Sequence, residues 1–272
     1  MEHYWKRTSS KHLNWNSRPH KFDFSRLGSL LLIFTFIEDS FRIMTQWNKQ
    51  LFFMVLRRGF PIMFSRVYLL LLVVTMSLCS LAILVNSKRF LNVSCRILIL
   101  CQCSQICVYG LINDYTFILK NASLVGGLLL LMAKNKTLES KSKTVYGGLP
   151  VMLNEKTLVY LSLFGRILLI LLFVSTLFEA SIYRFCTGLV ALIGCISIVV
   201  GFKAKTCAIY LFLFLCISNI LSNNWWSVHE LHPQRDFMKY DFFQTLSIMG
   251  GFLLLRQHGP GSYSLDEHQN QF

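Results

Sequence analysis

One stretch of the chain decides the class of fold. Residues 67–85 read Val67-Tyr-Leu-Leu-Leu-Leu-Val-Val-Thr-Met-Ser-Leu-Cys-Ser-Leu-Ala-Ile-Leu-Val85 and carry no charged side chain. A helix that crosses the hydrocarbon core of a bilayer needs about 20 mostly apolar residues. The stretch, with the apolar residues that precede it, therefore predicts a transmembrane helix at 62–85.

The composition of the whole chain supports the same class. Of the 272 residues, 54% are hydrophobic and only 15% are charged, and the mean hydropathy is +0.49. A soluble domain is about 45–50% apolar and about 25% charged, so a single water-soluble core has no room for this much apolar surface. The composition argues against a soluble enzyme, a disordered chain and a fibrous protein. It predicts an all-α, polytopic membrane bundle.

Further apolar runs bring the expected number of transmembrane helices to about eight. The runs at 184–201 and 204–221 are separated only by Gly201-Phe-Lys-Ala-Lys205, so the boundary between them is the hardest to place. The other runs lie at 27–47, 93–112, 117–133, 158–179 and 240–256.

Matching residues indicate that the chain contains two similar four-helix halves. The apolar run that ends at Glu38 resembles the run that ends at Glu179, and Gly126-Gly127 has a counterpart in Gly250-Gly251. This match places the two glutamates at the same depth. The expected segments are a cytosolic basic tail at 1–26, a first half at 27–133, a cytosolic loop at 134–157, a second half at 158–256 and a cytosolic tail at 257–272.

The positive charge predicts the orientation. The chain has a net charge of +14, with 27 Lys and Arg residues. If the N-terminus is cytosolic, 17 of these cations fall on the cytosolic side and nine on the other. Because Lys and Arg in short loops stay in the cytosol, we expect both termini there, and we read the charge as a topology signal rather than as a nucleic-acid-binding surface.

The sequence carries no signature of catalysis or of metal binding. Its nine cysteines form no C-x-x-C pair and lie mostly within apolar runs, where small residues pack helices together. We therefore expect no disulfide framework, no metal site, no cofactor and no catalytic residue.

Charged and polar residues near the predicted luminal ends of the helices are the candidates for a functional site. A charge left at mid-bilayer costs at least about 2.5–3.5 kcal/mol, so such groups face a partner or a wet cavity. Two interpretations stay open: ion pairs that join helices, and a lumen-facing cavity that holds a ligand. The candidates are Glu38, Asp39, Arg42, Trp47, Asp114, Lys120, Asn121, Glu179, Arg184, Asp236, Lys239, Tyr240, Asp241 and Gln244.

Several motifs occur in order along the chain. The most specific are Phe34-Thr-Phe-Ile-Glu-Asp-Ser-Phe-Arg42 with Gln46-Trp47, Lys120-Asn121 followed by Gly126-Gly127, and Phe237-Met-Lys-Tyr-Asp-Phe-Phe-Gln-Thr245. Shorter matching segments lie at 148–152, 165–169, 201–205 and 259–267. Through these motifs, residues 27 to 267 resemble the Surfeit locus protein 4 family.

The resemblance implies a multi-spanning cargo receptor. Such a receptor binds soluble secretory proteins in the lumen of the endoplasmic reticulum and packages them, through the COPII coat, for transport to the Golgi. It implies residence in the membranes of the endoplasmic reticulum, the intermediate compartment and the Golgi, and makes the candidates above cargo-binding residues. The bilayer is a further expected partner, a homo-oligomer stays open, and nucleic acid is not expected.

One feature departs from the family. Members usually return to the endoplasmic reticulum with the COPI coat, through lysines near the C-terminus, but Asp266-Glu-His-Gln-Asn-Gln-Phe272 contains none. We therefore expect a divergent member without the dilysine signal, and whether the COPI coat is a partner stays open. The four-helix unit also resembles DoxX-like proteins, which leaves a membrane redox or small-molecule or lipid carrier as the alternative.

Overall fold

The structure, a computed structural model, describes residues 24–147, 155–177, 182–200, 203–229, 232 and 234–258. Every regular element in these residues is helical. The long helices are α1 (Phe24–Thr45), α3 (Ile62–Leu84), α4 (Lys88–Tyr109), α5 (Tyr115–Gly147), α6 (Glu155–Leu177), α7 (Ile182–Val200), α8 (Ala204–Ser222) and α9 (Gln234–His258). The short elements are α2 (Trp47–Phe52), a π-helical turn (Phe53–Arg57) and 3-10 turns at Leu111–Asn113 and Trp225–Ser227. The prediction of an all-α, polytopic membrane bundle is confirmed.

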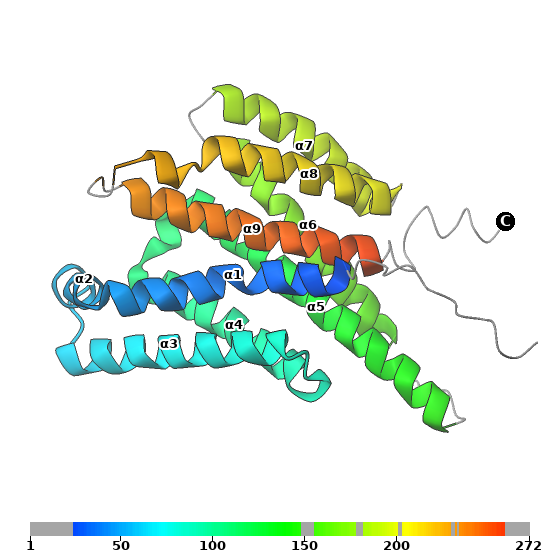
Figure 1. Ribbon diagram of the computed structural model, residues 1–272, viewed down its shortest axis with the longest axis horizontal. Helices are drawn as coiled ribbons and strands as arrows, with labels where there is room; N and C mark the ends of the chain where they lie inside the picture. Colours follow the sequence, from blue (N-terminus) through cyan, green and yellow to red (C-terminus); the bar gives the residue numbers. More distant parts are fainter. Residues whose placement is uncertain are drawn as a thin grey trace, which may run out of the picture.

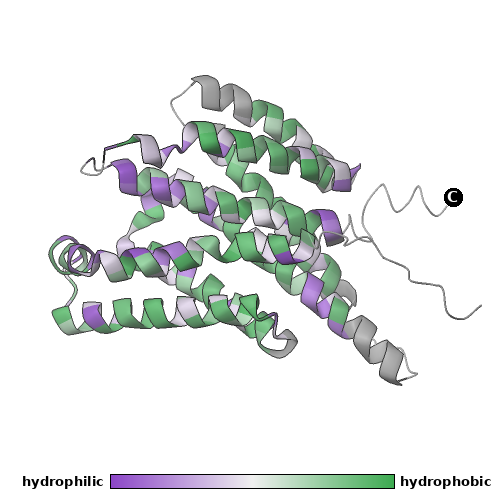
Figure 2. Cartoon of the chain, in the orientation of Figure 1, coloured by the Kyte–Doolittle hydropathy of each residue, from purple (hydrophilic) through white to green (hydrophobic). Residues whose placement is uncertain are grey.

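Helices α1 and α9 bring charged side chains into the bundle side by side. Five helical stretches of the described chain are long and apolar enough to cross a membrane: Ile62–Leu84, Phe90–Tyr109, Tyr115–Glu139, Thr157–Ser175 and Ala204–Ser227. Helices α1 and α9 are not among them, and they lie next to each other, with α3 beyond α1 and α8 beyond α9 (Figure 1). Figure 2 shows their hydrophilic residues concentrated toward the end where α2 lies. Charges on the two helices can therefore pair with each other at that end.

Two close helix pairs form the centre of the bundle. Helix α1 packs along α9, and α5 packs along α6. A Cβ atom added to Gly250 would lie 2.5 Å from the carbonyl oxygen of Gly28, and one added to Gly126 would lie 2.7 Å from the carbonyl oxygen of Gly165. Both distances are shorter than any real Cβ contact, so glycine is required for these backbones to approach each other.

The same contacts repeat in the two halves. The hydroxyl of Ser247 donates to the Leu31 carbonyl at 2.9 Å, and that of Ser123 donates to the Leu169 carbonyl at 3.0 Å. Each half thus packs its last helix against the first helix of the other half. Gly127 and Gly251 meet between them, where a Cβ on Gly251 would lie 3.2 Å from the Cα of Gly127. The arrangement supports the predicted internal repeat.

The packing glycines indicate the register of the repeat. Gly28 and Gly165 make equivalent contacts, and the fully buried Phe36 and Phe173 each follow them by eight residues. In this register the position of Glu38 corresponds to that of Ser175, one helical turn before Glu179. The packing glycines thus favour a register about one turn away from the predicted match of Glu38 with Glu179. Glu179 lies outside the described residues, so that match stays a prediction.

Other boundaries also differ from the sequence pattern. The segment between the first two apolar runs contains α2, which lies across the end of the bundle (Figure 1). The segment 134–157, predicted as a loop, begins as helix because α5 continues to Gly147. The predicted boundary near Gly201 is confirmed, since α7 ends at Val200 and α8 begins at Ala204.

Both ends of the described bundle lie on the same side of it. The guanidinium of Arg256, near the end of α9, lies 4.2 Å from the ring centroid of Phe24, the first residue of α1. This contact agrees with an even number of crossings. The predicted tails 1–26 and 257–272 lie almost entirely outside the described residues.

Candidate binding site at one end of the bundle

The first part of the site is a carboxylate with a partner on each oxygen. Asp39, on α1, is 2% exposed. One of its oxygens pairs with the guanidinium of Arg42, one turn further along the helix, and the other accepts a hydrogen bond of 2.8 Å from the side-chain amide of Gln105 on α4. Asp39 thus joins α1 to α4.

The second part is a carboxylate with free capacity. Glu38, next to Asp39, is 6% exposed. The ammonium of Lys239 on α9 lies 3.5 Å from its Oε1 atom. Within the described part of the chain, neither carboxylate oxygen of Glu38 accepts a hydrogen bond. A buried carboxylate normally has several donors around it, so Glu38 has acceptor capacity left. Arg42 Nε, Trp225 Nε1 and Gln244 Oε1 in the same region also lack a partner among the described residues.

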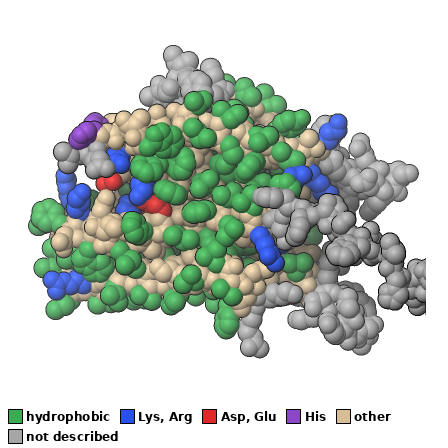
Figure 3. Space-filling model, viewed as in Figure 1, with side chains coloured by type: hydrophobic (Ala, Val, Ile, Leu, Met, Phe, Trp, Pro, Cys, Tyr) green, Lys and Arg blue, Asp and Glu red, His purple; other side chains and the backbone are tan. Residues whose placement is uncertain are grey.

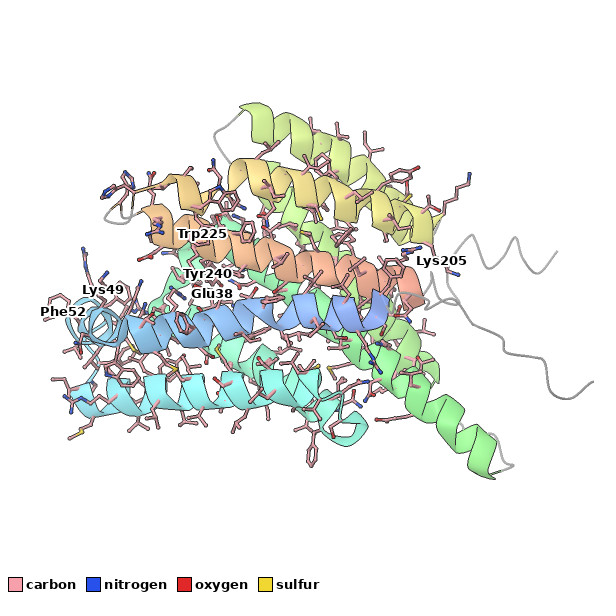
Figure 4. All side chains as sticks on the ribbon, viewed as in Figure 1. Glu38, Lys49, Phe52, Lys205, Trp225 and Tyr240 are labelled. Atoms are coloured by element: carbon pink, nitrogen blue, oxygen red, sulfur yellow. The ribbon has the colours of Figure 1, made fainter. Side chains whose placement is uncertain are left out.

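Aromatic rings and cations surround the two carboxylates. The guanidinium of Arg42 lies 5.1 Å from the ring centroid of Tyr240, which stacks on Phe117 with 6.0 Å between centroids. The ammonium of Lys239 lies 5.8 Å from the ring centroid of Trp225. Figure 4 shows Glu38, Tyr240 and Trp225 near the same end of the bundle, with Lys49 and Phe52 of α2 beyond them. We call Glu38, Asp39, Arg42, Gln105, Lys239 and Tyr240 the carboxylate cluster.

A cluster of amides lies on the adjacent turns of α4, α5 and α9. The side-chain oxygen of Asn121 accepts hydrogen bonds from the amides of Gln102 and, at 2.9 Å, Gln244. One residue before Asn121, Lys120 pairs with Asp241 at 3.1 Å. These bonds hold three helices together and fix the height of α9 relative to α5.

Nine of the fourteen predicted residues therefore gather at this end of the bundle. They are Glu38, Asp39, Arg42, Lys120, Asn121, Lys239, Tyr240, Asp241 and Gln244.

Three others lie apart from the clusters. Asp114 accepts hydrogen bonds from the amide of Phe117 at 3.1 Å and from the hydroxyl of Thr116, and so begins α5. Asp236 accepts a hydrogen bond of 3.1 Å from Gln46 at the exposed start of α9. Trp47, the first residue of α2, packs against the hydrophobic core. Each has a local structural role.

Two predicted residues are not located by the structure. Glu179 lies outside the described residues, and Arg184 lies in α7 at a position whose side chain is outside the description. Whether either contributes to the site stays a prediction.

Sequence reasoning missed the two glutamines of α4. Gln102 and Gln105 are buried and bond to Asn121 and Asp39, respectively. Both stand in an otherwise apolar run, three residues apart, and so on one face of the helix. Two amide side chains at that spacing in an apolar run indicate a polar helix–helix contact. They were missed because sequence reasoning considered charged side chains first.

The described residues of the site are charged, amide and aromatic groups suited to binding. In the part of the chain that the structure describes, no three His, Cys, Asp or Glu side chains lie close enough together to hold a metal ion. Asp39 has a partner on each oxygen, which suits an ion pair that joins helices, whereas Glu38 accepts no hydrogen bond from the described residues, which suits a ligand site. On the face seen in Figure 3, acidic side chains gather with lysines and arginines near one end, and hydrophobic side chains cover most of the rest. The arrangement suits a ligand that approaches from the aqueous side at that end.

Comparison with known proteins decides the family. The model of the SURF4 family matches residues 16–272. The chain belongs to the SURF4 family. This confirms the resemblance that the motifs indicated.

Relatives match the chain over most of its length. The ER-derived vesicles protein ERV29 of Saccharomyces cerevisiae is 38% identical over 243 residues, which cover 89% of this chain and 75% of ERV29. The Surfeit locus protein 4 homolog of Drosophila melanogaster is 34% identical, over 90% of each chain. The Surfeit locus protein 4 homolog of Schizosaccharomyces pombe is 35% identical, over 89% of this chain and 80% of that protein. No solved structure matches the chain.

Proposed function

We propose that this SURF4-family chain is a cargo receptor. It binds soluble secretory proteins in the lumen of the endoplasmic reticulum and carries them, through the COPII coat, into vesicles bound for the Golgi. The carboxylate cluster faces the lumen, and both termini face the cytosol. The name of the yeast relative, an ER-derived vesicles protein, supports this compartment.

The observation that carries the proposal is the unsatisfied carboxylate of Glu38. A receptor needs a site that binds without reacting, and Glu38 offers buried acceptors beside the rings of Tyr240 and Trp225 and the cations Arg42 and Lys239. Such a set of groups can bind the charged and hydrophobic side chains of a polypeptide at once.

A carrier of small molecules is the competing function, and it predicts a different bound species. The test is purification of the full chain with a proximity-labelling enzyme placed in the loop between α8 and α9, followed by identification of labelled proteins and of bound small molecules. Enrichment of soluble secretory proteins over the same enzyme anchored to an unrelated membrane helix supports the receptor. A stoichiometric quinone or lipid, with no enrichment of secretory proteins, contradicts it and favours the carrier.

A further inference from the structure

Lys239 is paired with Glu38 by charge, at a distance longer than that of an ordinary hydrogen bond. Its ammonium lies 3.5 Å from the Oε1 atom of Glu38 and 5.8 Å from the ring centroid of Trp225. The lysine side chain is 30% exposed, whereas that of the glutamate is 5% exposed. The ammonium thus lies between the solvent and the buried carboxylate, with an aromatic ring beside it that can also hold a cation.

The other lysine of the site is bound differently. Lys120 donates a hydrogen bond of 3.1 Å to Asp241, and its side chain is only 13% exposed. Asp241, at 32%, is the more exposed member of that pair. The buried group is therefore the lysine in one pair and the carboxylate in the other, so the Lys120–Asp241 pair is a matched control for the Lys239–Glu38 pair.

We propose that Lys239 is a resident counter-ion which the ligand displaces. In the empty site its ammonium neutralises Glu38. A cationic N–H group of the ligand, an ammonium or a guanidinium, then takes its place, donates hydrogen bonds to the carboxylate oxygens and leaves Lys239 over the ring of Trp225. Gln244 Oε1, Arg42 Nε and Trp225 Nε1 also lack a partner among the described residues, but only the two oxygens of Glu38 carry a negative charge. A cationic donor is therefore the group that gains most there, because a hydrogen bond between two charged groups is stronger than a neutral one.

This inference rests on the proposed function, because it takes the natural ligand to be a polypeptide. It assigns opposite roles to the two members of one ion pair. Glu38 binds the ligand, and Lys239 competes with it. Removal of Lys239 should therefore strengthen binding, whereas a lysine that merely contacts the ligand would weaken binding when removed.

The first experiment traps the resident pair in the full-length protein in detergent. A carbodiimide condenses a carboxylate with an adjacent amine into an amide and takes up the lost water as a urea, so it should join Glu38 to Lys239. We expect butylguanidinium, a cation that does not couple, to lower the yield of this cross-link by about two- to fivefold, the range expected for a partly exposed ion pair. Neutral butylurea, or sodium chloride at the same concentration, should not lower this yield. The yield of the Lys120–Asp241 cross-link should stay constant in all three solutions. An unchanged Glu38–Lys239 cross-link, or an equal fall in both, overturns the proposal.

The second experiment measures protection of the protein against heat by butylguanidinium. Lys239→Met should lower the concentration for half-maximal protection by about two- to fivefold. Lys205→Met, at an exposed lysine at the opposite end of the bundle (Figure 4), should leave it unchanged. Weaker protection of Lys239→Met overturns the proposal. Neither experiment uses a secretory protein. A negative result would therefore argue against the displacement of Lys239 and would leave the proposed receptor function untouched.

Discussion

Gly250 of α9 and Gly28 of α1 pack backbone against backbone, so closely that a Cβ atom on Gly250 would lie 2.5 Å from the Gly28 carbonyl oxygen. The same atom would lie 2.7 Å from the backbone nitrogen of Leu32. This contact places Glu38, ten residues after Gly28, opposite Lys239 on α9. The position of the binding site thus depends on a glycine contact far from it along the helix.

Substitution of Gly250 by alanine should destabilise the bundle. The added methyl group meets backbone atoms, which move only if the two helices separate, and we expect a loss of about 1–3 kcal/mol in the free energy of unfolding. Gly194→Ala is the control, because its Cβ would meet the end of the flexible Leu211 side chain at 3.2 Å. Thermal unfolding in detergent measures both. Equal stability of the two variants would show that the backbones of α1 and α9 are not in close contact at Gly28 and Gly250.

Two arginines, the partly exposed Arg42 and the buried Arg166, should respond in opposite ways to replacement by methionine. Arg42 pairs with Asp39, so Arg42→Met leaves a buried carboxylate without its cation. We expect the free energy of unfolding to fall by about 1–3 kcal/mol. This is less than for a fully buried pair, because the arginine side chain is 28% exposed. Arg166, in the middle of α6, donates one hydrogen bond, to Ser162, and its Nε and Nη1 atoms have no partner among the described residues. Arg166→Met should therefore preserve or raise stability. Chemical unfolding of both variants checks the contrast, and a larger loss for Arg166→Met would reveal a partner for that guanidinium.

The general fold was predictable because its signal is local. Apolar length alone located the eight long helices, including the boundary between α7 and α8. Helix α2 was not predicted, because a helix of six residues at the surface of the bundle needs no continuous apolar run. The continuation of α5 to Gly147 was also missed, since a solvated helix beyond a bilayer can be polar.

The site was only partly predictable because its chemistry depends on pairing. The sequence identified Glu38 and Asp39 as charges that need partners, and could not say that Gln105 and Arg42 satisfy Asp39 while Glu38 stays unsatisfied. That difference depends on how α4 and α9 rotate against α1. Packing glycines such as Gly28 and Gly250 help to set this rotation, and the sequence does not show which backbone each of them contacts.

The chain contains three Asn-x-Ser/Thr glycosylation sequons, at Asn92, Asn121 and Asn135, and all three should stay unmodified. Asn121 lies near the start of α5, a helix long and apolar enough to cross the membrane, and is therefore too close to the bilayer for the luminal transferase. Asn135 lies toward the other end of that span, which faces the cytosol in the proposed orientation. Asn92 also faces the cytosol in the proposed orientation. In the same orientation, protease added to intact microsomes should digest an epitope tag at the N-terminus. Endoglycosidase treatment and protease protection are the measurements. A mass shift with the first, or a shielded tag in the second, contradicts the orientation.

The central claim, that the carboxylate of Glu38 binds secretory cargo, is tested most directly by Glu38→Gln. This change keeps the shape of the side chain and removes its charge, and a charge-assisted hydrogen bond is worth about 1.5–3 kcal/mol. Glu139→Gln, the same change at the opposite end of the bundle where Glu139 accepts a hydrogen bond from Asn135 at 3.0 Å, is the matched control. The measurement is the amount of soluble secretory protein labelled by the luminal proximity enzyme, with each variant at equal expression and equal thermal stability. We expect Glu38→Gln to lower it by about tenfold or more and Glu139→Gln to leave it unchanged. Full labelling by a stable, normally expressed Glu38→Gln protein would contradict the account.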